Sequence, residues 1–361
     1  MSCTDKPLPL TLRSLTGLRA LAAGAVFLRH SGYLFDHTSL RHVTLRLFVQ
    51  GGVGVSFFFV LSGFVLTWSW RPGVIAFYRR RFARIYPAYL ASTIAAAGLI
   101  WLIGGTVSTT AVVAVLLLSQ SWFSSPSTFN ALNSVSWSLS CEAFFYLLFP
   151  ALIFAAVRLP VGVRRLAFAA LVFDVIAIPT WVFGPNVWLD YIFPPTRLLE
   201  FLCGMLLALE VKSGRWPRVR LAVAWPIAIT GYLLAGEAGH WALLGLTGAQ
   251  GYAAVTIVPF LILIGAYATR DVAGEPTRMG SAVAVRLGEI SYAFYLVHYL
   301  LIRLFAHYTG SWRPTLPEAL ATVFALLAAA FVTSATLFFV VERPAERRLR
   351  PALRRREAVA V

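Results

Sequence analysis

Long apolar stretches recur along this chain of 361 residues and are separated by short polar segments. About 20 consecutive apolar residues are enough for a helix to cross the hydrocarbon core of a bilayer. The stretches that meet this requirement lie at 15–35, 52–70, 82–104, 138–157, 164–183, 195–211, 221–236, 251–269, 287–306 and 317–341. The pattern predicts an all-α fold, a polytopic membrane helical bundle with about ten transmembrane helices.

The distribution of arginines orients these helices. If the N-terminus is cytoplasmic, ten crossings bring every arginine-rich segment to the inner side, as cytoplasmic loops require. Those segments are 71–81, 158–165, 211–220, 270–286 and the tail from Arg343. A further apolar run, Val112 to Leu118, is borderline, and a crossing there would put the basic tail outside. We therefore expect 105–137 to be an outer-face or re-entrant segment, with both termini cytoplasmic.

Three regions follow from this topology. Residues 1–14 form a cytoplasmic N-terminal segment, 15–342 the membrane domain, and 343–361 a basic cytoplasmic tail. No internal repeat and no low-complexity linker is evident. This weakens, without excluding, the class of transporters built from repeats.

Composition supports a membrane location, because 59% of the residues are hydrophobic and 13% are charged. The formal net charge of +16 could suggest a nucleic-acid partner. Its confinement to short loops instead indicates contact with the anionic inner surface of the cytoplasmic (inner) membrane. The lipid bilayer is the expected partner and nucleic acid is not. Cys3, Cys141 and Cys203 are odd in number and unevenly spaced, so they predict neither a disulfide framework nor a zinc site.

Ionisable residues inside apolar helices are costly and are therefore functional candidates. Arg19 and His30 are eleven residues apart in the first predicted helix. This spacing puts them about 20° apart around the helix and about 16 Å apart along it. A long anionic ligand entering from the cytoplasm could thus be held by Arg19 with its reactive end near His30. Imidazole can accept a hydroxyl proton near neutral pH. The alternative is that Arg19 reaches the headgroups and His30 bonds a neighbouring helix.

Three further sites carry candidate chemistry. Arg81 and Arg84 are helical neighbours whose guanidinium groups could bind the phosphates of a cofactor such as CoA, or simply set topology. Glu142 lies in an apolar helix and should be protonated or pair, for example with Arg19, Arg29 or His30. Glu142 either forms a structural ion pair or orients the catalytic base. His298 is a weaker candidate for the same cavity.

Arg197 and Glu200 lie three residues apart on one predicted helix, near the start of its apolar run. Residues at this spacing are neighbours on a helix surface, so the two side chains could simply pair with each other. No cluster of His, Asp and Glu has the spacing of metal ligands, and no metal is expected.

Together these segments resemble the acyltransferase-3 family of integral membrane acyltransferases. The similarity runs from residue 12 to residue 344, in the family's order. It is carried by Leu15-Thr-Gly-Leu-Arg19 with His30, Gly52-Val-Gly-Val-Ser-Phe-Phe-Phe-Val-Leu-Ser-Gly-Phe64, Arg81-Phe-Ala-Arg84-Ile-Tyr-Pro87, Trp137-Ser-Leu with Glu142-Ala-Phe-Phe-Tyr146, Pro194-Pro-Thr-Arg197-Leu-Leu-Glu200-Phe-Leu-Cys-Gly204, Ile290-Ser-Tyr with His298, and Glu342-Arg-Pro344.

The resemblance implies an enzyme that moves an acyl group, commonly acetyl, from acyl-CoA as co-substrate to a hydroxyl of a carbohydrate, glycolipid or glycosylated metabolite. It implies a catalytic group and two binding groups, which we assign as follows: catalytic His30, Arg19 and Glu142; CoA-binding Arg81 and Arg84; substrate-binding His298, Trp137 and Tyr146. The motif with Thr16 before Gly17 is similar to a branch that acylates antibiotics such as macrolides. No esterase-like domain follows the last predicted helix, so a fused second transfer step is not expected.

Two other classes remain open at this point. A transporter of a polar lipid or glycoside could use the same buried polar residues as its path. An inactive relative could serve as a scaffold, although Arg19, His30 and Arg84 are all present. Within the enzyme class, direct transfer and a covalent acyl-histidine both fit the residues.

Overall fold

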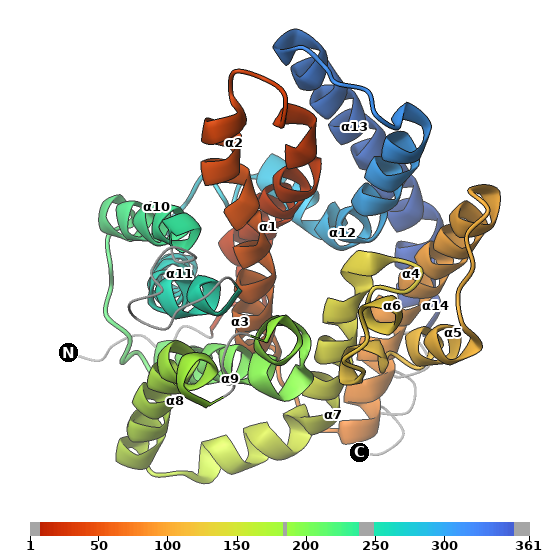
Figure 1. The fold of residues 1–361 in the computed structure, drawn as a ribbon. Helices are drawn as coiled ribbons and strands as arrows, with labels where there is room; N and C mark the ends of the chain where they lie inside the picture. Colours follow the sequence, from red (N-terminus) through yellow and green to blue (C-terminus); the bar gives the residue numbers. More distant parts are fainter. Residues whose placement is uncertain (1–7, 183–185, 238–248, 350–361) are drawn as a thin grey trace.

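The computed structural model describes residues 8–182, 186–237 and 249–349, and within these ranges the secondary structure is entirely helical (Figure 1). The elements in chain order are α1 (Arg13–Ser31), η1 (Gly32–Phe35), α2 (Arg41–Phe48), η2 (Val49–Gly52), α3 (Val53–Trp68), α4 (Val74–Leu102), α5 (Thr109–Leu116), η3 (Gln120–Trp122), α6 (Pro126–Phe129), η4 (Ser134–Ser136), α7 (Trp137–Arg158), α8 (Val161–Val182), η5 (Trp188–Ile192), α9 (Pro194–Lys212), α10 (Leu221–Glu237), α11 (Ala249–Ala273), α12 (Ala282–Thr309), α13 (Leu316–Leu337), η8 (Phe338–Glu342) and α14 (Arg343–Leu349).

The polytopic helical bundle predicted from the sequence is confirmed. Each of the ten predicted segments falls on one helix, in order α1, α3, α4, α7, α8, α9, α10, α11, α12 and α13. Within the described residues, seven helical stretches are long and apolar enough to cross a membrane, and α10 is a shorter apolar helix. Several helix ends differ from the prediction by up to five residues, and a larger difference, the largest, is at the start of α4. Helix α4 begins at Val74, because the arginine cluster continues the helix instead of forming a loop.

The segment 105–137 contains only short helices: α5, η3, α6 and η4. The longest of them, α5, has eight residues. A helix of this length extends about 12 Å, less than half of the hydrocarbon thickness. The prediction that no spanning helix forms here is therefore confirmed.

The basic segments gather at one end of the bundle. Ser14, at the start of α1, donates its backbone N–H to Asp271 near the end of α11, at 2.8 Å. The indole of Trp68 donates to the carbonyl of Pro9, and Lys212 donates to the carbonyl of Thr67. These bonds place the N-terminal segment and the ends of α3, α9 and α11 together. We call this the basic end of the bundle.

Helices α1 and α12 run parallel to each other through the bundle. Near the basic end they approach so closely that a Cβ on Gly288 would collide with the carbonyl oxygen of Thr16. Further along both helices, the rings of Phe27 and Phe294 lie 5.9 Å apart. The matching residue order on both helices fixes the parallel direction. Both helices therefore begin at the basic end and finish at the opposite end.

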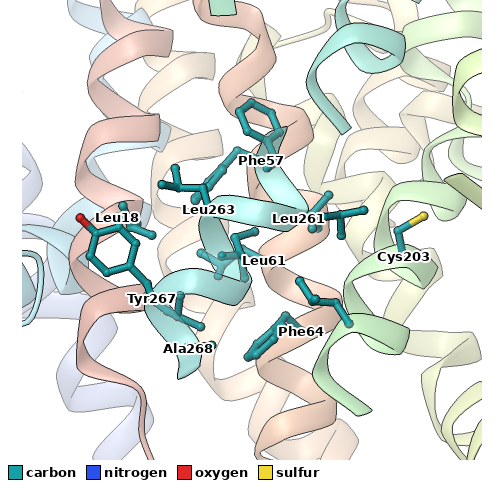
Figure 2. Packing of buried hydrophobic residues seen from close by; sticks show 14 of the residues in the cluster. Leu18, Phe57, Leu61, Phe64, Cys203, Leu261, Leu263, Tyr267 and Ala268 are labelled. Atoms are coloured by element: carbon teal, nitrogen blue, oxygen red, sulfur yellow. The ribbon is translucent and has the colours of Figure 1, made fainter. Parts of the chain in front are cut away.

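Helix α3 lies in the middle of the bundle beside α1 (Figure 1). Its buried face packs against α1, α9 and α11 in one hydrophobic cluster, which includes Leu18, Leu61, Cys203 and Leu261 (Figure 2). Membrane helices approach closely where small residues face each other. Helices α3 and α9 meet in this way, with Gly63 against Phe201 and Gly204 against Val60.

Candidate functional site

Five helices enclose a polar cavity of about 120 Å³ inside the bundle. We call it the arginine cavity. Its polar lining comes from α1, α3, α4, α7 and α12, and consists of Arg19, Ser62, Arg81, Arg84, Ser138, Glu142, Tyr146, Ser291, Tyr292 and Tyr295. Three arginines thus share one enclosed space with one carboxylate. The lining thus holds more cationic than anionic side chains, and guanidinium groups that face a cavity suit an anionic ligand.

The carboxylate of Glu142 is held within this cavity by a neighbour on its own helix. Tyr146 lies one turn further along α7, and its hydroxyl donates to Oε2 of Glu142 at 2.9 Å. The hydroxyl of Ser62 is 3.4 Å from that of Tyr146. Arg19 and Arg81 are near enough for their charges to act on the carboxylate. Among the described residues Glu142 forms no ion pair with Arg19, Arg29 or His30, and Arg19 acts on it through charge across the cavity.

Arg81 and Arg84 differ in their surroundings although both line the cavity. Nη1 of Arg84 lies 3.1 Å from Oε1 of the buried Glu342 and 3.2 Å from Oε2 of Glu346. Arg84 thereby ties α4 to the final helical segment. The Nε atom of Arg81 is buried, and no group of the described residues accepts a hydrogen bond from it. An unpaired buried donor is costly, so Arg81 retains hydrogen-bonding capacity for a ligand.

His30 and His298 form a hydrogen-bonded pair between α1 and α12. Nδ1 of His30 lies 2.9 Å from Nε2 of His298, and Nδ1 of His298 lies 3.1 Å from the carbonyl oxygen of Phe294. A carbonyl can only accept, so Nδ1 of His298 carries a proton. In the neutral form its Nε2 then accepts the proton of His30 Nδ1. This chain of bonds leaves Nε2 of His30 unprotonated and able to act as a base.

The pair lies beyond the wall of the arginine cavity. Arg19 lines the cavity, whereas His30 and His298 do not. Tyr295 connects the two sites because it lines the cavity and its ring lies 5.8 Å from that of His298. The ring of Phe58, also in the lining, lies 6.2 Å from that of Tyr295. Cavity and histidines are thus adjacent along α12, with Tyr295 between them.

Three further residues that the sequence singles out also lie outside the cavity lining. Trp137 packs in a buried aromatic cluster, with its ring 4.9 Å from that of Tyr191. Arg197 and Glu200 form the predicted pair: Nη2 of Arg197 lies 2.9 Å from Oε2 of Glu200, and both are buried. Arg197 also donates to the hydroxyl of Ser56 at 2.9 Å. This pair joins α9 to α3.

Four residues at the site are not among the candidates predicted from the sequence: Ser62, Tyr292, Tyr295 and Glu342. Tyr292 and Tyr295 lie within the motif that ends at His298, and the hydroxyl of Tyr295 is 2.9 Å from that of Ser138. Glu342 lies in the Glu-Arg-Pro motif. Their position inside the family's motifs was the one feature of the sequence that could have identified them. Within the described residues, no group of three or more His, Cys, Asp and Glu side chains comes together as metal ligands would.

The chain matches the model of a known family, described as an acyltransferase domain, over residues 12–338. This match covers the whole arginine cavity and the histidine pair. The chain belongs to the acyltransferase-3 family. It is thus a multi-pass membrane acyltransferase, and an acyl donor and an acceptor are its substrates.

Two curated relatives of the family are similar over most of their length. The chain is 39% identical to "Acyltransferase MdmB" of Streptomyces mycarofaciens, over 95% of this chain and 94% of the relative. It is 30% identical to "Exopolysaccharide production protein ExoZ" of Rhizobium meliloti, over 83% of this chain and 91% of the relative. No solved structure matches the chain.

Proposed function

We propose that the protein is an O-acyltransferase of the cytoplasmic membrane that uses acyl-CoA, with acetyl as the acyl group, and acylates a hydroxyl of a sugar-bearing acceptor. The observation that carries this proposal is the succession of two sites along α1 and α12. The arginine cavity comes first, and the histidine pair with a free base at Nε2 of His30 follows it.

The arginine cavity is the proposed route of the donor. CoA carries phosphates that guanidinium groups bind strongly, and its thioester lies at the end of a long arm. In this proposal Arg81, with its unpaired Nε, contacts the phosphate-bearing part and Arg19 lies further along the arm. Arg84 contributes charge while it is anchored by Glu342. Glu142 and Tyr146 position Arg19 and Arg81.

His30 acts as the general base in this mechanism. Its Nε2 takes the proton of the acceptor hydroxyl while the hydroxyl oxygen attacks the thioester carbonyl. The C–S bond then breaks, and the departing CoA sulfur receives the proton held by His30. The products are an ester and free CoA. His298 is a positioning residue, because it fixes the tautomer of His30.

The topology proposed for this reaction has ten crossings and cytoplasmic termini. The basic end then faces the cytoplasm, where acyl-CoA is available and cationic segments are favoured. The names of the two curated relatives support the chemistry proposed here. One is an acyltransferase and the other is a protein of exopolysaccharide production, which favours a sugar-bearing acceptor.

The test measures CoA release by purified protein in lipid nanodiscs. Acetyl-CoA is supplied with a panel of acceptors: methyl glycosides, a glycolipid and a glycosylated macrolide. Wild type is compared with His30→Ala and with His307→Ala, a control that alters an exposed histidine on α12. Acetyl-CoA binding is measured separately for each variant.

We expect acceptor-dependent CoA release by wild type and His307→Ala, and none by His30→Ala that still binds acetyl-CoA. Turnover by His30→Ala equal to wild type would refute the role of His30 and leave the acyl transfer standing. If wild type binds no acetyl-CoA and releases no CoA with any acceptor, the result would contradict acyl transfer and favour the transporter alternative. Uptake of a radiolabelled glycoside into proteoliposomes would then test that alternative.

A further inference from the structure

A second polar pocket lies where the two histidine-bearing helices end. Its volume is about 240 Å³, and it is lined by Tyr33, Leu34, Asp36, His37, Thr309, Gly310, Ser311, Trp312, Arg313 and Pro314. We call it the outer pocket. One wall comes from η1 and the turn after it, which directly follow α1. The other wall comes from the turn that follows α12 at Gly310. No residue is shared with the lining of the arginine cavity.

The outer pocket is close to the proposed base. Tyr33 follows His30 by three residues, which is about 5 Å of helical rise. Because α1 and α12 are parallel, the outer pocket lies at the opposite end from the basic segments. The order along both helices is therefore arginine cavity, histidine pair, outer pocket. Two substrates could meet at His30 from opposite ends.

The lining combines aromatic rings with hydrogen-bonding groups. The residues Tyr33 and Trp312 are 38% and 39% exposed, so part of each ring is free to contact a ligand. Asp36, His37 and Arg313 are also exposed, and among the described residues none of their side chains makes a hydrogen bond or ion pair. The Asp36 carboxylate accepts hydrogen bonds, the His37 ring can donate or accept them, and the Arg313 guanidinium donates them.

We infer that the outer pocket is the binding site for a sugar ring of the acceptor. A sugar ring has apolar C–H faces that pack on aromatic rings and hydroxyl groups around its edge, which matches this lining. A pocket smaller than the ~300–1,000 Å³ of typical small-molecule sites suits one ring better than a whole acceptor. This inference rests on the proposed function. It adds the location of the acceptor, on the side of the membrane opposite the donor.

The competing explanation is an aromatic belt. Trp and Tyr are enriched wherever helices meet the membrane–water interface, whether or not a ligand binds there. Trp101 provides the matched control, because it lies near the end of α4, is 82% exposed and is not part of the outer pocket. An aromatic belt predicts that replacing Trp101 or Trp312 by alanine has the same effect on sugar binding. A sugar site predicts that only Trp312 matters.

The experiment measures saturation-transfer NMR on methyl β-D-glucopyranoside and methyl α-L-rhamnopyranoside, with the full-length protein in nanodiscs free of glycoside detergents. The variants are Trp312→Ala, Tyr33→Ala, Tyr33→Phe and Asp36→Asn, with Trp101→Ala as control. We expect saturation of at least one probe by wild type and Trp101→Ala. The signal should fall at least fivefold in Trp312→Ala and Tyr33→Ala, less in Asp36→Asn, and be retained in Tyr33→Phe.

Acetyl-CoA binding is measured on the same samples and verifies that each variant is folded. No saturation by wild type, or an equal loss in Trp101→Ala, would overturn the sugar site. Acetyl-CoA binding that persists in such a case would leave the proposed acyl transfer intact. Sugar saturation without any acetyl-CoA binding by wild type would support the sugar site and contradict the proposed acyl transfer. The two proposals can therefore fail separately.

Discussion

Nδ1 of His30 lies 2.9 Å from Nε2 of His298, although 268 positions separate the two residues in the chain. This bond decides which nitrogen of His30 is free. We predict that His298→Leu lowers kcat by about 10²-fold or more, because a base in the wrong tautomer loses most of the ~10²–10⁴-fold gain of general base catalysis. The KM for acetyl-CoA should change little.

A conservative variant separates this role from packing. In His298→Gln the side-chain carbonyl can still accept the proton of His30 Nδ1, so kcat should recover to within about tenfold of wild type. Steady-state kinetics on both variants, beside His307→Leu, provide the comparison. Equal kcat values for the Leu and Gln variants would contradict the tautomer argument.

Arg81 should contribute to donor affinity and not to the chemical step. A hydrogen bond to a charged group is worth about 1.5–3 kcal/mol, so we expect Arg81→Ala to raise the Kd of acetyl-CoA about 10- to 100-fold. The control is Arg79→Ala, which alters an exposed arginine outside the cavity lining. Isothermal titration with CoA and acetyl-CoA measures the effect. A Kd that changes equally in both variants would point to general surface charge.

The buried pair of Arg197 and Glu200 should act on stability. Removing one partner of such a pair leaves an uncompensated charge and typically costs about 3–5 kcal/mol. We therefore expect Glu200→Ala to lower the unfolding temperature strongly in nanodiscs. The double variant Arg197→Met with Glu200→Leu should recover part of the loss. If Glu200→Ala abolishes CoA release with an unchanged unfolding temperature, the residue has a role in the reaction instead.

Reciprocal glycines set the distance between α3 and α9. A Cβ on Gly63 would collide with the carbonyl oxygen of Phe201, and one on Gly204 would collide with that of Val60. Because backbone carbonyls cannot yield as side chains do, Gly63→Ala and Gly204→Ala should each destabilise the fold by about 1–3 kcal/mol. Gly98→Ala is the control, since nothing lies within 4 Å of the added carbon. It should leave the unfolding temperature unchanged or raise it slightly.

The helices could be predicted from the sequence because each is a local feature. A run of apolar residues long enough for a bilayer specifies its helix by itself, so each of the ten predicted segments falls on a helix; within the described residues, seven helical stretches are long and apolar enough to cross a membrane. Residues 105–137 could be excluded as a membrane-spanning helix because a crossing there would put the basic tail on the outer side. The start of α4 at Val74 was missed, because arginines are good helix formers but do not extend an apolar run.

The partners of the site residues were harder to predict. The spacing of Arg19 and His30 correctly assigned both to one helix, but it could not reveal that Tyr295 separates their surroundings. His298 was recognised as polar in an apolar helix, whereas its bond to His30 depends on the parallel register of α1 and α12. That register is set by close contacts such as Gly288 against Thr16. Tertiary contacts of this kind leave no periodic signal in one sequence.

Tyr295 and Phe58 also bear on the integrity of the membrane. The arginine cavity and the outer pocket lie at different levels along α1 and α12, and their linings have no residue in common. A continuous watery path between them would let protons leak and dissipate the ion gradients that the cell spends energy to maintain. In the proposed reaction, these two rings would let an acyl group pass from the donor side toward the acceptor while the bilayer stays electrically insulating.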